Sequence, residues 1–239
     1  MKNNRGFVLW FEKVNMRAFF LFLFGLSFGS FAMAIEEPKF EVVIKDVTPE
    51  GTFELRQYAP YIVAETWVDG DMDAASSKGF RVIADYIFGN NQLAGSASGE
   101  KAAAKIAMTA PVTVEPLTAQ SEKIAMTAPV TIEPSMGMSG TGKWRVHFVM
   151  PSEYTLASLP TPNNSAVHLR EVPTTTLAVV TYSGFNTQHR IQQETENLTR
   201  WMQIKKLKAK GGALLARYDP PWTLPIWRRN EVQFEVSKP

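Results

Sequence analysis

Few side chains in this sequence belong to the types that carry out chemistry. The 239 residues include three histidines and no cysteine. Without cysteine the chain cannot form disulfides, thiolate zinc sites, iron–sulfur clusters, a cysteine nucleophile or a covalent c-type haem linkage. No two of His147, His168 and His189 have the spacing of metal ligands. The histidines therefore indicate ordinary surface or packing roles, and we expect no metal site.

Two glycine-rich stretches match functional motifs only in part. Residues 137–143 (GMSGTGK) fit the pattern GxxxxGK, but Trp144 replaces the Ser or Thr that would hold magnesium. The residues that follow have the pattern of a strand, whereas a phosphate-binding loop needs a helix N-terminus. Residues 95–99 (GSASG) place serine one position away from a nucleophile elbow. We therefore predict loops at both stretches and no enzyme activity.

The first 34 residues have the pattern of a targeting segment. Four basic residues and one acidic residue precede an apolar run at 18–33, which ends in the A-x-A cleavage signal Ala32-Met33-Ala34. The run is at or below the length that spans about 30 Å of hydrocarbon. We expect a cleaved signal peptide at 1–34 and a single periplasmic or secreted domain at 35–239. The alternative is an uncleaved anchor at 18–34 in the inner membrane.

The charge of the chain argues against nucleic acid as a partner. The formal net charge is +2, and it becomes −1 when the first 34 residues are removed. A nucleic-acid-binding surface needs an excess of basic residues to neutralise phosphates. The predicted domain has no such excess.

The first half of the predicted domain reads as strands followed by a helix. Residues 53–58 (FELRQY) and 61–68 (YIVAETWV) are strand-like and separated by Ala59-Pro60, which predicts a hairpin. Apolar residues at three and four spacing predict a helix over 73–88. Asp71 or Asp73 can cap its start, and Gly89 lies where a C′ glycine belongs. The polar stretch 90–104 is typical of a loop.

Two nearly identical segments come next. Residues 105–116 (KIAMTAPVTVEP) and 123–134 (KIAMTAPVTIEP) each have the alternation of a β-strand. Pro111 and Pro129 cannot donate to a strand ladder, which predicts a bulge or a sheet edge at each. Residues 144–150 form the clearest strand, with Trp144 and Phe148 on one side and His147 on the other.

The second half repeats the first more loosely. At an offset of 114 residues, 53–58 aligns with 167–172, and Gly70 aligns with Gly184. A second helix is predicted from about 187 to 210, closed by Gly211-Gly212, and strands are predicted at 212–218 and 230–236. We therefore predict an α+β domain of two pseudo-symmetric repeats that share one sheet, with two helices packed on it.

Several longer strings resemble a known family. The segment IAMTAPV at 106–112 and 124–130, FVMPSEY at 148–154, YDPPW at 218–222 and RRNEV at 228–232 are together similar to the SOUL haem-binding protein family. The resemblance covers 38–236 and suggests a bacterial, exported member. It implies a distorted antiparallel β-barrel or sheet of two repeats flanked by two α-helices, similar to regulatory-factor effector-binding folds. It also implies non-covalent binding of haem or a related tetrapyrrole, without established catalytic activity.

The resemblance also implies where the tetrapyrrole binds. The family's cleft lies beside the first helix, the MTAPV strand and the loop before RRNEV. The corresponding residues here are Arg81, Ile87, Phe88, Met108, Trp222, Leu224, Ile226 and Arg228. Arg81, Arg228 or Arg229 would pair with a haem propionate. We expect apolar enclosure to be the main mode of binding, with no axial ligation by His147.

Each of these assignments has a structural alternative. Met108 and Met126 would instead be core or sheet-face residues, and Trp222 would be a packing plug between prolines. Arg228-Arg229 would form an ion pair with Asp219 or Glu231. The domain as a whole would then be a structural or interaction module for another apolar ligand or a partner peptide. Either MTAPV copy can occupy the family position.

Overall fold

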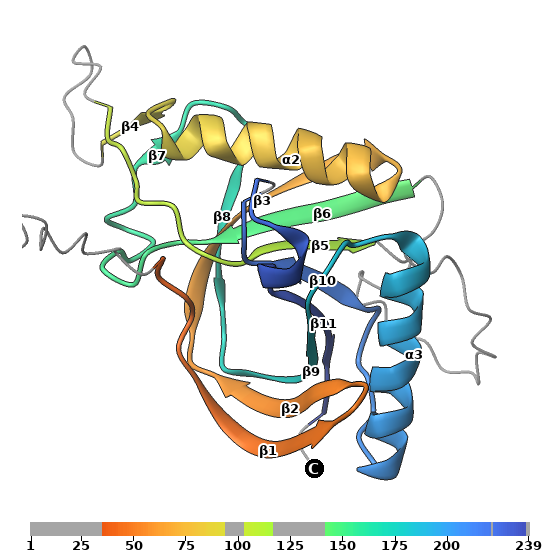
Figure 1. Ribbon diagram of the computed structural model, residues 1–239. Helices are drawn as coiled ribbons and strands as arrows, with labels where there is room; N and C mark the ends of the chain where they lie inside the picture. The colour runs from red at the N-terminus through yellow and green to blue at the C-terminus, as the bar shows by residue number, and fades with distance from the viewer. Residues whose placement is uncertain (1–34, 94–102, 117–141, 221, 238–239) are drawn as a thin grey trace, which may run out of the picture. The chain divides into compact units, whose positions relative to one another are not determined.

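One large antiparallel sheet dominates the fold (Figure 1). The computed structural model describes residues 35–93, 103–116, 142–220 and 222–237. The sheet has nine strands in the order β1-β2-β9-β11-β10-β5-β6-β3-β8. Their bounds are β1 Phe40–Thr48, β2 Gly51–Tyr58, β3 Tyr61–Gly70, β5 Val112–Pro116, β6 Gly142–Val149, β8 His168–Val172, β9 Thr175–Tyr182, β10 Leu214–Arg217 and β11 Asn230–Glu235. A second sheet pairs β4 Asn91–Gln92 with β7 Thr161–Pro162.

The large sheet is open. Strands β1 and β8 lie at its two edges and do not pair with each other in the described part of the chain. Of the two predicted forms, barrel or sheet, the sheet is confirmed and the closed barrel is wrong. With two helices, α2 Met72–Ile87 and α3 Gln188–Ile204, the predicted α+β class is also confirmed.

The predicted hairpin of β2 and β3 is wrong. Both strands form, and Ala59-Pro60 connects them, but they do not pair. Strand β2 pairs with β1 and β9, and β3 pairs with β6 and β8. The alternation of the sequence predicted two strands correctly but carries no information on their partners, which come from distant parts of the chain.

The strand order is symmetric about its centre. The series β2, β3, α2, β5, β6 has the same order of element types as β8, β9, α3, β10, β11. In the sheet, β2-β9-β11-β10 mirrors β8-β3-β6-β5, and the two series meet where β10 pairs with β5. This arrangement is that of two pseudo-symmetric halves. A duplication of the sequence itself stays a prediction.

Both helices begin as the sequence predicts. The side chain of Asp71 accepts a hydrogen bond from the Ala74 amide, and that of Thr187 accepts one from the Arg190 amide. Helix α2 ends at Ile87 with Phe88 as its C-cap, and the predicted C′ glycine, Gly89, follows with a φ of 125°. Helix α3 ends at Ile204, earlier than predicted, because Lys206 adopts a φ of 58° that terminates the helix.

Part of the MTAPV segment is not a strand. In the first copy the strand β5 begins only at Val112, directly after Pro111, whereas 105–111 is irregular. This agrees with the absence of an amide donor at proline. The second copy, 123–134, lies outside the described residues, as do 95–99 and 137–141.

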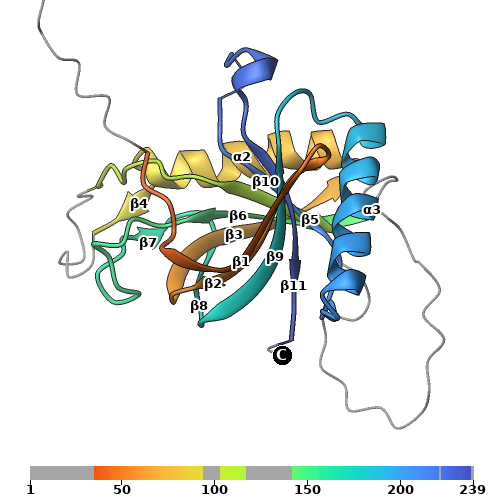
Figure 2. The same ribbon diagram turned by 60° about the horizontal axis from the view of Figure 1, so that its bottom comes forward.

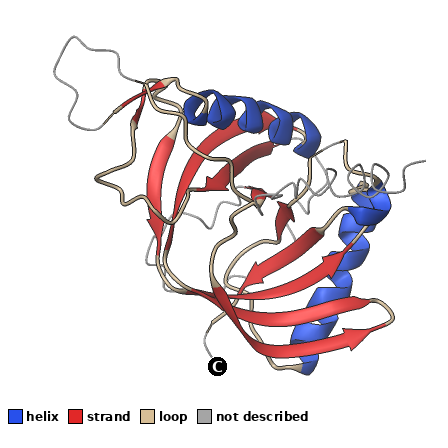
Figure 3. Ribbon diagram, turned by 60° about the vertical axis from the view of Figure 1, so that its left-hand side comes forward, coloured by secondary structure: helices blue, strands red, loops and turns tan. Residues whose placement is uncertain are grey.

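The two faces of the sheet differ in chemistry. On the helix face, α2 and α3 cover alternate residues such as Val146, Phe148, Val180 and Val232, which form one hydrophobic core (Figure 3). Helix α2 lies close to β6: a Cβ atom on Gly79 would lie 2.5 Å from the Cβ of Val146. Helix α3 packs through the ring of Trp201, which stacks on that of Phe53 at 5.9 Å.

The opposite face, which we call the open face, carries buried charges. Arg56 donates to Glu54 at 2.7 Å and to Glu231 at 3.0 Å. Glu231 is fully buried and also accepts from the Tyr218 hydroxyl at 2.7 Å. In the other half of the sheet, Arg170 donates to Glu65 at 3.0 and 2.9 Å. A buried carboxylate without such donors would be strongly destabilising, so these clusters fix the strands in register.

Candidate ligand-binding surface

The loop between β10 and β11 presents apolar side chains to solvent. Trp222 is 82% exposed, Leu224 53% and Ile226 72%. Trp227, which the sequence analysis did not single out, is 69% exposed. Figure 2 shows this loop standing out from the sheet. We call residues 222–227 the apolar loop. The exposure of Trp222 rules out its alternative role as a packing plug.

Hydrogen bonds join the apolar loop to the segment around Gly184. A 3-10 turn, η2 (Pro225–Trp227), closes it, and the Gly184 amide donates to the Pro225 carbonyl at 2.9 Å. Gly184 has a φ of 108°, which favours glycine. The side chain of Asn230 donates to the Gly184 carbonyl at 3.2 Å. The apolar loop is therefore joined through Pro225 and Gly184 to the segment that follows β9.

The two arginines of RRNEV have different environments. Arg229 donates to both carboxylate oxygens of Glu37 at 3.0 and 2.8 Å and to Glu231 at 3.2 Å. Its amide donates to Asp219 at 2.6 Å. The structural alternative is thus confirmed for Arg229. Arg228 lies at the apolar loop, where its Nε donates to the Thr223 carbonyl at 2.7 Å.

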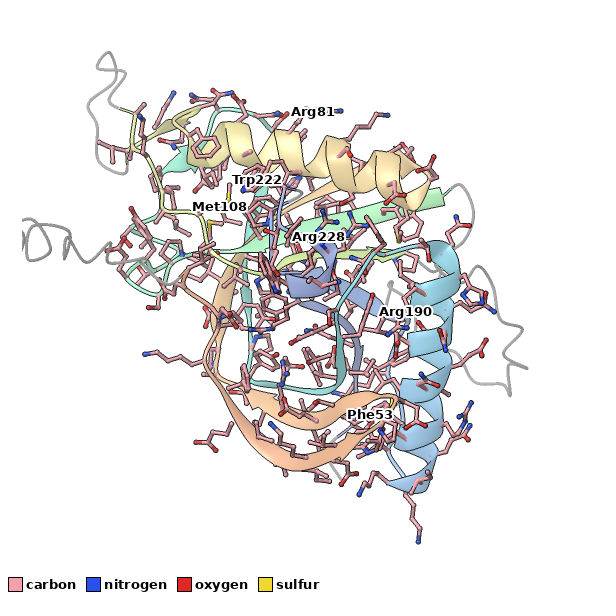
Figure 4. All side chains as sticks on the ribbon, in the orientation of Figure 1. Phe53, Arg81, Met108, Arg190, Trp222 and Arg228 are labelled. Atoms are coloured by element: carbon pink, nitrogen blue, oxygen red, sulfur yellow. The ribbon has the colours of Figure 1, made fainter. Side chains whose placement is uncertain are left out.

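The three residues predicted on α2 do not share one surface. Ile87 is only 1% exposed and belongs to the hydrophobic core, so it does not face a ligand in this structure. Phe88, at the helix C-cap, is 58% exposed. Arg81 is exposed on the outer side of α2 (Figure 4). It follows the buried Gly79 by two positions, or about 200° around the helix axis, and so points away from the sheet.

Met108 lies in the irregular segment before β5. The Ile106 amide donates to the Ile87 carbonyl at 2.8 Å, and the Thr109 hydroxyl donates to the Val149 carbonyl. These bonds tie the segment to the end of α2 and to β6. Met108 itself is 37% exposed, so its alternative role as a core residue is wrong. In the view of Figure 4, Met108, Trp222 and Arg228 all lie below α2.

Two cavities lie elsewhere in the domain, and none of the eight predicted ligand-binding residues lines either of them. The larger, of about 380 Å³, lies between residues 36–39, 59–62 and 149–156. The smaller, of about 110 Å³, lies on the open face. Among the described residues there is also no group of three His, Cys, Asp or Glu side chains that could hold a metal ion. Of the predicted residues, Trp222, Leu224 and Ile226 lie together on one exposed loop, whereas Ile87 is buried and Arg81 lies on the outer side of α2.

Sequence reasoning missed two further exposed aromatic residues in addition to Trp227. Phe185 is 62% exposed, and the Arg228 guanidinium lies 5.6 Å from the centre of its ring. Phe80 on α2 is 39% exposed and contacts Phe148, with ring centres 5.4 Å apart. Trp227 and Phe185 could have been suspected because each follows a turn residue, Pro225 or Gly184, and breaks the polar pattern of a loop.

No helix among the described residues has the length and apolar character needed to cross a membrane.

Comparison with known proteins identifies relatives of the whole domain. The family described as "SOUL heme-binding protein" matches residues 35–235. The mouse protein "Heme-binding protein 2" is 26% identical over 213 residues, which cover 87% of this chain and 89% of that protein. The crystal structure of the EcmrR C-terminal domain is similar with a TM-score of 0.52 and 12% identity, over 78% of this chain and 98% of that one. A complex of EcmrR with DNA gives a TM-score of 0.51 at 13% identity, over 78% of this chain and 57% of that one.

Proposed function

Because this chain belongs to the SOUL heme-binding protein family, we propose that it binds haem or a related tetrapyrrole without a covalent bond and acts as a carrier or buffer. The family is one of binding proteins, and the mouse relative bears the name of a haem-binding protein. The proposal for this chain is that the apolar loop, together with Phe88 and Met108, forms the surface that the ligand covers.

The observation that carries the proposal is the exposure of the apolar loop. Trp222, Ile226 and Trp227 are each about two-thirds exposed or more. Exposed apolar patches of this kind usually mark binding sites, because water contact with them is unfavourable. A flat apolar tetrapyrrole removes such a surface from water, and indole rings are suited to stack on its plane.

The polar edge of haem also has a partner at this surface. Haem carries two propionates, and a guanidinium binds a carboxylate through two parallel hydrogen bonds. Arg228 lies within the loop that carries Trp222 and Ile226. Arg81 lies on the outer side of α2. We therefore assign propionate binding first to Arg228, whose guanidinium lies 5.6 Å from the ring centre of the exposed Phe185.

Titration with hemin, followed at the Soret band, tests the proposal. Trp222→Ala should weaken hemin binding about tenfold or more, as expected for an aromatic residue central to a binding surface. Ile226→Ser and Ile204→Ser form a matched pair, because both isoleucines are 72% exposed and Ile204 lies at the far end of α3. Only Ile226→Ser should lower affinity.

Two results would reject the proposal. The first is the absence of saturable hemin binding at micromolar protein. The second is equal loss of affinity in Ile226→Ser and Ile204→Ser, which would indicate non-specific adsorption. Copurification of a lipid or a peptide with the apolar loop would instead favour the alternative, an interaction module for another apolar ligand or partner.

We further propose that the chain is exported to the periplasm or secreted, with residues 1–34 removed as a signal peptide. The support is the basic start, the apolar run and the A-x-A signal at 32–34. Mass spectrometry of the protein from the expressing cell should find Ile35 at its N-terminus. An intact N-terminus in the membrane fraction would favour the anchor at 18–34.

With the near-neutral charge of 35–239, we expect no binding to nucleic acid.

A further inference from the structure

The smaller cavity lies on the open face, between the two clusters of buried charges. It has a volume of about 110 Å³ and is lined from both halves of the sheet. Tyr61, His147 and Arg170 come from one half, and Leu177 and Gln233 come from the other. A tetrapyrrole does not fit, since pockets for ligands of drug size enclose several hundred Å³. The cavity is therefore separate from the proposed haem surface.

His147 supplies a polar group that the fold leaves unsatisfied. It is 8% exposed, and its Nδ1 atom has no hydrogen-bond partner among the described residues. Its cross-strand neighbours in the sheet are Glu65 and Thr113. Burial, followed by the charges of Arg145 and Arg170, lowers the pKa of His147 to about 3. The imidazole is therefore neutral, and one of its ring nitrogens carries a proton that it can donate.

Two arginines lie at this corner of the cavity, each beside a glutamate. Arg170 uses its Nε and Nη2 atoms on Glu65, at 3.0 and 2.9 Å, and its side chain is 37% exposed. Its Nη1 atom makes no hydrogen bond to the part of the chain described here. Arg145 contacts Glu115 and lies 3.8 Å from Glu65. Burial and the nearby charge of Arg170 lower the pKa of Arg145.

The acidic residues of the cavity are already paired. Glu115 contacts Arg145, and Glu235 lies 3.0 Å from Lys210. The remaining wall is mixed: Val149, Val172, Leu177 and Leu214, with Pro38 and Pro111, are apolar, whereas Tyr58, Thr113, Thr175 and Tyr218 carry hydroxyl groups. The cavity thus combines a corner that holds Arg170 and the unsatisfied imidazole of His147 with an apolar patch that includes Leu177 and Leu214.

We propose that this cavity is a second ligand site, which binds a small organic carboxylate. The carboxylate lies between the guanidinium of Arg170 and the imidazole of His147, and the apolar part of the ligand lies against Leu177 and Leu214. One oxygen accepts from Nη1 of Arg170 and the other from the imidazole N–H. A volume of about 110 Å³ is much larger than one water molecule requires and suits a short aliphatic or single-ring acid.

Calorimetric titration of the protein with three probes of similar shape tests the charge preference. The probes are benzoate, benzamide and benzylamine, which are anionic, neutral and cationic. Benzoate should bind saturably with a Kd of about 1 mM or below. Benzamide and benzylamine should each bind at least about tenfold more weakly than benzoate. Equal binding of benzamide would overturn the assignment to carboxylates, and preferred binding of benzylamine would reverse its sign. Absence of saturable benzoate binding would overturn the site.

The chain offers a matched control for the arginine. Arg170 and Arg190 have side chains 37% and 40% exposed, and each pairs with a buried glutamate, Glu65 or Glu194, at 2.9 Å. Arg170→Gln should lower benzoate affinity about tenfold, the effect expected when a charge-assisted hydrogen bond is lost, and Arg190→Gln should leave it unchanged. Equal effects of the two variants would overturn the proposal.

A second variant covers the case in which Arg170→Gln does not fold. Val172 is half-buried on the edge strand β8 and lines the cavity, so Val172→Trp should fill it and abolish benzoate binding. Retained binding in Val172→Trp would place the ligand elsewhere and overturn the proposal. Hemin binding, measured on the same samples, should be unchanged, so failure at this cavity is distinguishable from failure at the apolar loop.

Discussion

Substitution of Gly79 by alanine tests how closely α2 approaches the sheet. The added Cβ would lie 2.5 Å from both Cβ and Cγ2 of Val146 and 2.9 Å from its Cγ1. Ordinary carbon contacts are about 3.5–4.0 Å long. Because the Cβ of Val146 is fixed to the backbone of β6, a change of rotamer cannot relieve the contact. The helix must instead move away from the strand by about 1 Å, the deficit between these distances.

Two effects of opposite sign decide the stability of Gly79→Ala. In a helix interior without steric conflict, alanine is about 1 kcal/mol more favourable than glycine. Overpacking in a well-packed core costs about 1–3 kcal/mol, and movement of α2 would disturb its whole buried face. We expect the steric cost to exceed the gain in propensity. Gly79→Ala should then lower the free energy of unfolding by up to about 2 kcal/mol, the difference between the two effects.

Urea denaturation measures this change, and the same helix supplies the control. Ser77 is exposed on α2, so the difference between Ser77→Gly and Ser77→Ala gives the propensity term without the contact. Ser77→Ala should be more stable than Ser77→Gly, whereas Gly79→Ala should be less stable than the wild type, which has glycine at that position. If Gly79→Ala were as stable as the wild type or more so, the close approach of α2 to β6 would be refuted.

Further predictions concern the open face. Glu231→Gln should lower the free energy of unfolding by about 1.5–3 kcal/mol, because the buried Arg56 loses one of its two carboxylate partners and keeps only Glu54. Glu235→Gln, at an exposed pair, should cost less than about 1 kcal/mol; similar losses in urea denaturation would contradict the role of burial. The folded-state pKa of His147, about 3, lies below the unfolded value of about 6.5, so the unfolded chain binds the proton more tightly and stability falls as the pH drops below 6.5. Between pH 7 and pH 5 this histidine should account for about 2 kcal/mol of lost stability. His147→Gln should remove that part of the loss and the exposed His189→Gln should not; equal pH dependence of both variants would be the contrary result. His147→Ala should leave the Soret maximum of bound hemin unchanged, since His147 lies on the face of the sheet that α2 does not cover.

Local signals in the sequence predicted local structure well. Asp71 and Thr187 lie at the N-termini of the helices, and the alternation from Trp144 to Phe148 separates the two faces of β6 as predicted. Those features depend on residues within one or two turns of each other. Strand β1 was not predicted at all, because its burial pattern is mostly exposed and lacks the alternation of a half-buried strand.

Features that depend on distant pairing could not be predicted. The sequence 53–68 reads as a hairpin, but its two strands bind partners from the other half. The same limit applies to the ligand-binding surface. Ile87 and Phe88 are adjacent and both apolar, yet one is in the core and the other in solvent. The resemblance located the loop of Trp222 and Ile226 as a candidate site, whereas the cavity beside His147 has no linear motif.

The exchange of outer strands between the halves has a consequence for folding. Tyr58 of β2 lies opposite Thr175 of β9, and Glu65 of β3 lies opposite His168 of β8. Each half of the sequence therefore supplies an outer strand, β2 or β8, that pairs with a strand from the other half. A nascent chain that ends before residue 168 would leave both β2 and β3 with an unpaired edge, which is a template for aggregation. Contacts between residues so far apart in sequence also slow folding. Neither half is therefore an independent folding unit, and the domain should acquire its structure only after nearly all of it has been synthesised.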